Sequence, residues 1–262
     1  MIRASLLLLI LQSLTAYPQE NAQWFTGGTS IVAYTSDDSI WMAADSKSHV
    51  TSNAKNLPVT ADLVSCKILF LKNSISGFAG NFLRDYNAKG QLIYDIRNEM
   101  EMALNRGNSL QNSFNIFSNN TIWDLSVAMK YFHDNFPHIF DSLLGANSLA
   151  QTVFTSFINK KSFSKKWEFK LIGNSFSWYV TADTVEEYNE HRLLTLGYYD
   201  EIFDYLLKNQ GYITSPYPMK EKLNNLVQLE IDRHPDFVGS PVDIIVIYDR
   251  GYKWLQKKNK CD

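Results

Sequence analysis

The chain has 262 residues, of which 45% are hydrophobic and 20% are charged, and its formal net charge is −2 at pH 7. A chain of this length and composition can bury a sizeable core, which predicts a globular protein with one main domain. The nearly balanced charge argues against nucleic acid or an anionic membrane surface as a partner. The five histidines and two cysteines form no CxxC or His-x-x-x-His motif, so we expect no metal site and no cofactor.

The N-terminus has the pattern of a secretory signal peptide. Arg3 supplies a positive charge, residues 4–11 are mostly apolar, and residues 14–16 fit a cleavage site. The apolar run is too short for a membrane span, so no integral membrane segment is expected. A buried N-terminal helix is the alternative. The pattern predicts a signal peptide over residues 1–16 and an exported protein, located in the periplasm or outside the cell.

A β-hairpin is predicted where two runs of apolar and β-branched residues, 29–34 and 40–44, flank the polar residues 36–39. The hairpin returns the carboxylate of Asp45 to the side of Thr29. The two side chains share one face of the sheet only if the loop has an odd number of residues or carries a bulge. We therefore expect an odd loop or a bulge at residues 36–39.

Thr29 has the setting of an N-terminal nucleophile. It follows Gly27 and Gly28 and opens a strand. Cleavage of the Gly28–Thr29 bond would free the α-amine of Thr29, which can then act as the base for its own hydroxyl. Residues 17–28 would be a propeptide, and residues 29–262 the mature domain.

Apolar periodicity predicts strands, two helices, strands, two helices and strands, in this order. The expected strands cover residues 64–71, 74–79, 152–159, 167–172, 177–181, 242–248 and 252–255. The first helical pattern follows Phe82 and ends at Gly107, the second runs from Asn120 to near Pro137, the third covers residues 200–208, and the fourth begins near Pro218. This order fits an α+β fold, a four-layer αββα sandwich of two antiparallel sheets flanked by helices.

The two cysteines lie in different settings. Cys66 falls in an apolar strand, and Cys261 falls in a basic C-terminal tail. An exported protein can pair its cysteines. The unlike settings nevertheless favour two free thiols.

Three motifs in the first third of the chain carry a family resemblance. They are the Gly28–Thr29 junction with the run Ala43-Ala44-Asp45-Ser46-Lys47, the run Lys67-Ile68-Leu69-Phe70, and Gly77-Phe78-Ala79-Gly80. In this order they resemble proteasome β-subunits and their bacterial relatives, with a short insertion before Lys67. The resemblance implies the N-terminal nucleophile hydrolase fold, a threonine-type hydrolase that cleaves peptide or amide bonds, and assembly into a ring-shaped homo-oligomer.

The resemblance assigns a role to each of four residues. Thr29 is the nucleophile, and its α-amine, with an unperturbed pKa of about 7.7–8.0, is the base. Lys67 would lower the pKa of that amine through its positive charge, and Asp45 would keep Lys67 charged and oriented. The backbone N–H of Gly80, in a tight Ala-Gly turn, would stabilise the oxyanion of the tetrahedral intermediate.

Two parts of the family pattern are missing from this sequence. Residues 195–199 lack the serine that the family carries between glycines before its third helix. Ahead of the late strand, Asp236 is displaced by one residue and Val238 stands in place of a serine. Asp236 is the candidate that would substitute for the family's aspartate.

Three functions stay open from the sequence. The first is an exported threonine hydrolase that processes itself between Gly28 and Thr29. The second is a catalytically inactive protein of the same fold, a binding or assembly module in which Thr29 stays behind its propeptide. The third is an amidase of the same superfamily that acts on a small molecule and differs in the shape of its pocket.

Overall fold

The computed structural model describes residues 23–26, 29–52, 60–64, 66–71, 76–80, 84–86, 92–146, 148–188 and 191–258. The predicted signal peptide, the processing residue Gly28 and Cys261 lie outside the described residues, so the predictions made for them are untested. Among the described residues, no helix is long and apolar enough to cross a membrane.

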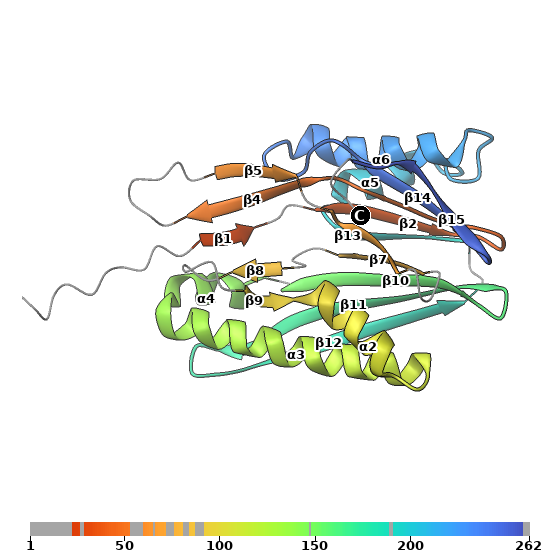
Figure 1. The fold of residues 1–262 in the computed structure, drawn as a ribbon. Coiled ribbons are helices and arrows are strands. Elements are labelled where there is room, and N and C mark those ends of the chain that lie inside the picture. Colours follow the sequence, from red (N-terminus) through yellow and green to blue (C-terminus); the bar gives the residue numbers. More distant parts are fainter. Residues whose placement is uncertain are drawn as a thin grey trace, which may run out of the picture.

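The fold is mixed α+β, with two five-stranded antiparallel sheets and five helices in the described part of the chain (Figure 1). The first, which we call the β10 sheet, has the order β12 (Ser177–Tyr188), β11 (Lys161–Asn174), β10 (Ala150–Ile158), β7 (Ser76–Gly80) and β6 (Ile68–Leu71). The second, the β2 sheet, has the order β13 (Arg192–Gly197), β2 (Ser30–Thr35), β3 (Ile40–Ala44), β14 (Asp243–Tyr248) and β15 (Gly251–Gln256). The helices are α2 (Ile96–Arg106), α3 (Leu110–Asn135), α4 (Pro137–Leu144), α5 (Asp200–Lys208) and α6 (Met219–Arg233).

Two smaller sheets accompany them. One has three strands in the order β1 (Gln23–Thr26), β4 (Lys47–Ser52) and β5 (Thr60–Val64), and the other pairs β8 (Arg84–Tyr86) with β9 (Leu92–Asp95). Strand β1 belongs to the predicted propeptide and pairs antiparallel with β4, with Thr26 opposite His49. The predicted propeptide therefore contributes a strand to the folded chain.

Side-chain alternation along the strands divides the core into three clusters. In β2, Ile31 and Ala33 point to a cluster shared with Val153 of the β10 sheet, so the two large sheets face each other. Their neighbours Val32 and Tyr34 point to the opposite side, where they pack with residues of α5 and α6. Helices α2, α3 and α4 pack on the outer face of the β10 sheet around Trp167, Phe117 and Phe154. Helices thus cover the outer face of each sheet, as Figure 1 shows.

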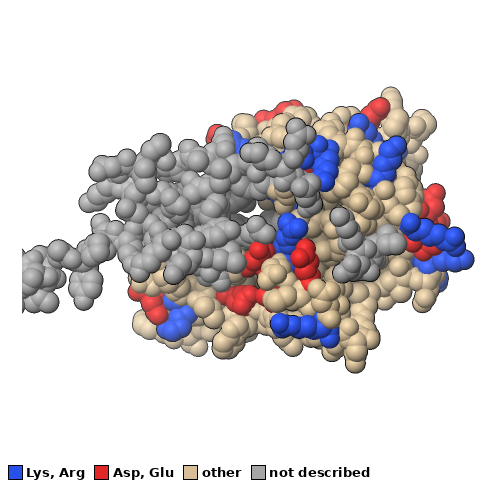
Figure 2. Space-filling model, viewed as in Figure 1, with Lys and Arg blue, Asp and Glu red and all other residues tan. Residues whose placement is uncertain are grey.

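Charged side chains of both signs are mixed on the surface. Figure 2 shows Lys and Arg beside Asp and Glu over the described part of one face. This distribution agrees with the small formal net charge of −2.

The helix predictions were right for some boundaries and wrong for others. Helix α5 occupies residues 200–208 as expected. Helix α3 begins at Leu110 rather than at Asn120, because the Ser109 side chain caps it by accepting from the N–H of Asn112. The first turns are rich in Asn, Gln and Ser, which hid the apolar face formed by Phe114 and Phe117.

Two further predictions of secondary structure were wrong, and strand β13 was not predicted. Residues 92–95 form strand β9, and the side chain of Asp95 caps the helix that follows. The expected strand over residues 64–71 is two strands, and Lys67 lies in the break between them. Leu193 and Leu194 lie on opposite faces of strand β13, so both faces are apolar. The strand therefore lacks the alternation of apolar and polar residues that predicts a strand, and it was missed.

Candidate active site

A buried ion pair joins the two large sheets. The Nζ atom of Lys67 lies 2.6 Å from Oδ1 of Asp45, and the exposed fractions of the two side chains are 4% and 0%. Asp45 directly follows β3 of the β2 sheet, and Lys67 directly precedes β6 of the β10 sheet. Because a buried charge is costly without a partner, each of these side chains depends on the other.

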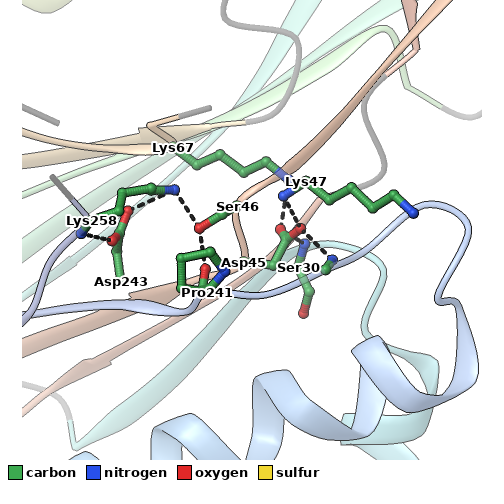
Figure 3. Close-up of polar contacts among 9 residues, drawn as sticks. Ser30, Asp45, Ser46, Lys47, Lys67, Pro241, Asp243 and Lys258 are labelled. Atoms are coloured by element: carbon green, nitrogen blue, oxygen red, sulfur yellow. Dashed lines mark hydrogen bonds and ion pairs between the residues drawn. The ribbon is translucent and has the colours of Figure 1, made fainter. Parts of the chain in front are cut away.

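Backbone amides complete the surroundings of the Asp45 carboxylate. Oδ1 also accepts from the N–H of Ser30 at 2.9 Å. Oδ2 accepts from the N–H of Lys47 and from that of Gly239, both at 3.1 Å. Figure 3 shows Ser30, Lys47 and Lys67 around the Asp45 carboxylate. Charge-assisted hydrogen bonds of this kind hold a carboxylate in one orientation.

The hairpin that carries Asp45 differs from the expected one. Ile31 pairs with Ala44 and Thr35 with Ile40, so the loop over residues 36–39 has an even number of residues and the pairing shows no bulge. The expectation of an odd loop or a bulge was wrong. Asp45 lies one residue past the end of β3 and still reaches Lys67, so their contact does not require Asp45 and Thr29 to share one face of the sheet.

Burial changes the acidity of Lys67. Desolvation lowers the pKa of its ammonium from 10.5 to about 8, although the charge and the hydrogen bond of Asp45 act in the opposite direction. The charge of Lys258 lowers the pKa further. A lysine with a pKa of about 8 exchanges its proton near neutral pH.

Thr29 lies at the start of the same hairpin and is only 2% exposed. Its carbonyl oxygen accepts from the N–H of Tyr198 at 2.6 Å. Gly197 has a φ of +77°, and a Cβ added to it would lie 1.9 Å from the Thr29 carbonyl oxygen. This position therefore needs glycine, both for its backbone conformation and for the close approach to Thr29.

The structure connects Thr29 with Asp45 and Lys67 through Ser30. Ser30 follows Thr29 in the chain, its N–H donates to Asp45, and its carbonyl oxygen accepts from the N–H of Asp45 at 3.1 Å. Asp45 in turn holds Lys67. Asp45 and Lys67 thus belong to one hydrogen-bonded unit with Ser30, and Thr29 adjoins this unit as the residue before Ser30.

The other two predicted site residues, Gly80 and Asp236, are not placed as the sequence predicted. Gly80 is in strand β7 rather than in a tight turn, and its N–H donates to the carbonyl of Lys67 at 3.3 Å. Asp236 is exposed, and in the described part of the chain the Asp45 carboxylate receives the N–H of Gly239 from that loop instead. Gly239 was missed, because it acts through its backbone N–H rather than through a side chain.

A second buried ion pair adjoins the first and was also missed. Nζ of Lys258 lies 2.9 Å from Oδ2 of Asp243, and the backbone N–H of Lys258 donates to Oδ1 at 3.0 Å. Nζ of Lys258 also donates to Oγ of Ser46, and Oγ of Ser46 donates to the carbonyl of Pro241 (Figure 3). No sequence motif marks a lysine near the C-terminus as part of a site.

Cys66, the residue before Lys67, is disulfide-bonded. Among the described residues there is no free cysteine. The expectation of a free thiol was therefore wrong for Cys66. The bond constrains the chain next to the lysine of the buried pair.

The described residues contain no group of three or more His, Cys, Asp or Glu that could hold a metal ion. Comparison of the chain with protein-family models finds no match, and comparison with curated proteins finds none either.

Proposed function

We propose that this chain is a threonine hydrolase of the N-terminal nucleophile type that cleaves a peptide or amide bond. In this proposal, the two facing sheets and their outer helices form the four-layer αββα sandwich of that superfamily. The observation that carries the proposal is the buried Lys67–Asp45 pair at 2.6 Å, located where the hairpin begins at Thr29. The proposal includes assembly into a homo-oligomeric ring, which the resemblance implies.

The proposed reaction begins after the Gly28–Thr29 bond is cut. Oγ of Thr29 attacks the substrate carbonyl carbon, and the freed α-amine of Thr29 takes the hydroxyl proton. The ammonium of Lys67 favours this transfer, because its positive charge stabilises the developing alkoxide. Asp45, fixed by three backbone N–H groups, keeps Lys67 in place.

The intermediate then collapses in two balanced steps. The amine portion of the substrate leaves with the proton held by the Thr29 α-amine, which gives an ester on Oγ. Water attacks that ester, the α-amine again accepts and returns a proton, and the acid product leaves with the Thr29 hydroxyl restored. Gly80 is the proposed oxyanion donor. In the structure this N–H donates to the Lys67 carbonyl at 3.3 Å, just beyond the usual range of distances, and it would give up this weak bond to donate to the oxyanion.

One observation favours the catalytically inactive alternative. Strand β1 lies in the predicted propeptide and pairs along its whole length with β4. A segment held in this way can remain attached and keep the Thr29 amine blocked. The alternative predicts a folded protein in which Thr29 never becomes N-terminal.

Covalent labelling tests the proposed function without knowledge of the substrate. A β-lactone acylates a nucleophilic hydroxyl by ring opening, so the wild type is expected to gain one adduct mass on Thr29. Thr29→Ala is expected to gain none, and Thr29→Ser is expected to keep the adduct because it keeps the hydroxyl. An unlabelled wild type with an intact fold would contradict the proposal.

A further inference from the structure

The pairing of β14 with β3 places the Lys258–Asp243 pair beside the Lys67–Asp45 pair. Asp243 opens β14 and pairs with Ala44, the residue before Asp45. Lys258 follows β15, the edge strand beside β14, and returns to Asp243. The exposed fractions of the Lys258 and Asp243 side chains are 6% and 1%. Two buried ion pairs therefore stand next to each other at the same end of the β2 sheet.

A continuous path of contacts leads from Lys258 to the Asp45 carboxylate. Lys258 contacts Oγ of Ser46, and the N–H of Ser46 donates to the carbonyl of Gly239 at 2.8 Å. The N–H of Gly239 donates to Oδ2 of Asp45 at 3.1 Å. Oγ of Ser46 also contacts the carbonyl of Pro241, so Lys258 fixes the turn that contains Gly239 as well as the residue after Asp45.

We propose that Lys258 is a positioning residue for the Asp45–Lys67 pair: it holds Ser46 and the turn at residues 239–241 against Asp45, and it places a second buried positive charge near Lys67. This inference rests on the proposed function, because it assigns Lys258 a role in the reaction attributed to that pair. Lys258 itself touches neither Thr29 nor substrate in this mechanism.

The charges around the two lysines give this role a measurable signature. Within the described part of the chain, Asp45, Asp243 and Lys67 face Lys258 from the hairpin, from β14 and from the β10 sheet. Lys47 directs its Nζ away from them, to the carbonyl of Pro235 at 2.7 Å. The positive charge of Lys258 lowers the pKa of Lys67, because two nearby ammonium groups disfavour each other's protonation. With a pKa of about 8, Lys67 still carries its charge at pH 7, as the proposed reaction requires, and its titration reports on the position of Lys258.

The test is a titration of Lys67 by NMR in the full chain, with ¹³Cε-labelled lysine and assignment by loss of the signal in Lys67→Arg. Lys258→Met is expected to raise the midpoint of the Lys67 titration above its wild-type value of about 8. Lys258→Arg keeps the charge and is expected to leave the midpoint near the wild-type value. Lys257→Met is the matched control, because that neighbouring lysine is exposed and lies over the ring of Trp254.

Lys258→Met leaves Asp243 buried without its ion-pair partner, which can prevent folding. A second variant tests the inference in that case. Lys258→Met combined with Asp243→Asn removes both charges and keeps an acceptor at the Oδ1 position. This double variant is also expected to raise the midpoint, since Lys258 is the member of the pair that acts on Lys67. An unchanged midpoint in a folded Lys258→Met or double variant would overturn the inference.

The proposed hydrolase function and the proposed role of Lys258 are tested by different measurements. The midpoint of Lys67 does not depend on whether Thr29 reacts, so the titration tests the inference even if the β-lactone leaves the wild type unlabelled. If the midpoint shifts but labelling and the pH profile of labelling stay the same, Lys258 has an electrostatic effect without a part in the reaction, and the positioning role is contradicted.

Discussion

Lys67 and Asp45 meet at 2.6 Å across the boundary between the two large sheets, and both side chains are shielded from solvent. The two residues are 22 positions apart in the sequence and flank strands of different sheets. Their contact exists because each follows or precedes a strand by one residue at the same end of the molecule. The proposed chemistry and part of the stability of the fold depend on this contact.

Replacement of Lys67 by an apolar residue should destabilise the protein, because it removes the Nζ hydrogen bond to Asp45 together with the charge. Lys67→Met leaves Asp45 buried without its ion-pair partner, which is expected to lower the free energy of unfolding by about 3–5 kcal/mol. Urea denaturation measures this change. Lys130→Met is the control, because Lys130 forms an exposed pair with Asp134, and such pairs contribute little. Equal stability of Lys67→Met and the wild type would show that the buried pair does not form.

The stability of the protein should depend on pH through Lys67. The pKa of Lys67 is about 8 in the folded chain and 10.5 for an ordinary lysine, so the unfolded chain binds more protons between these values. Stability is therefore expected to rise as pH increases from 8 to 10.5 and to fall again as pH is lowered through 8. The measurement is the difference in free energy of unfolding between wild type and Lys67→Met across this range, since other titrating groups cancel in the difference. A difference that does not change with pH would contradict the lowered pKa.

A side chain at Gly197 should displace Thr29. In Gly197→Ala, the new Cβ would lie 1.9 Å from the Thr29 carbonyl oxygen on a backbone with a φ of +77°. We expect a loss of about 2 kcal/mol or more in the free energy of unfolding, together with loss of β-lactone labelling. Gly251→Ala is the matched control, because an added Cβ there meets no atom within 4 Å. Equal behaviour of the two variants would show that Gly197 does not support Thr29.

The disulfide at Cys66 should stabilise the segment that carries Lys67. Cys66→Ser is expected to lower the free energy of unfolding by about 2–4 kcal/mol. Peptide mapping without reductant should recover Cys66 linked to Cys261, because the chain contains two cysteines. Recovery of Cys66 as a free thiol from protein purified under oxidising conditions would contradict this prediction.

Elements that depend on local sequence patterns were predicted better than contacts between distant parts of the chain. Helix α5 and the hairpin strands β2 and β3 were predicted because their apolar patterns are local. The start of α3 was missed, because a polar first half hides buried Phe114 and Phe117. An odd loop or a bulge at residues 36–39 was expected from strand alternation, but the contact between Asp45 and Lys67 does not require it.

The residues that surround the candidate site were the hardest to predict. Gly239 acts through its backbone N–H, which every residue except proline carries, so its type gives no signal. Lys258 resembles the other lysines of a basic C-terminal segment and differs from Lys257 only in being buried. Its role depends on the return of β15 beside β14, a contact that sequence periodicity does not specify.

The most direct test of the central claim is the N-terminal sequence and intact mass of the purified protein beside Thr29→Ala. If Thr29 is an active N-terminal nucleophile, the wild type should begin at Thr29 and the variant should retain residues of the segment 17–28. If both proteins retain that segment, Thr29 does not process itself, and the catalytically inactive alternative, in which β1 stays paired with β4, would replace the hydrolase proposal.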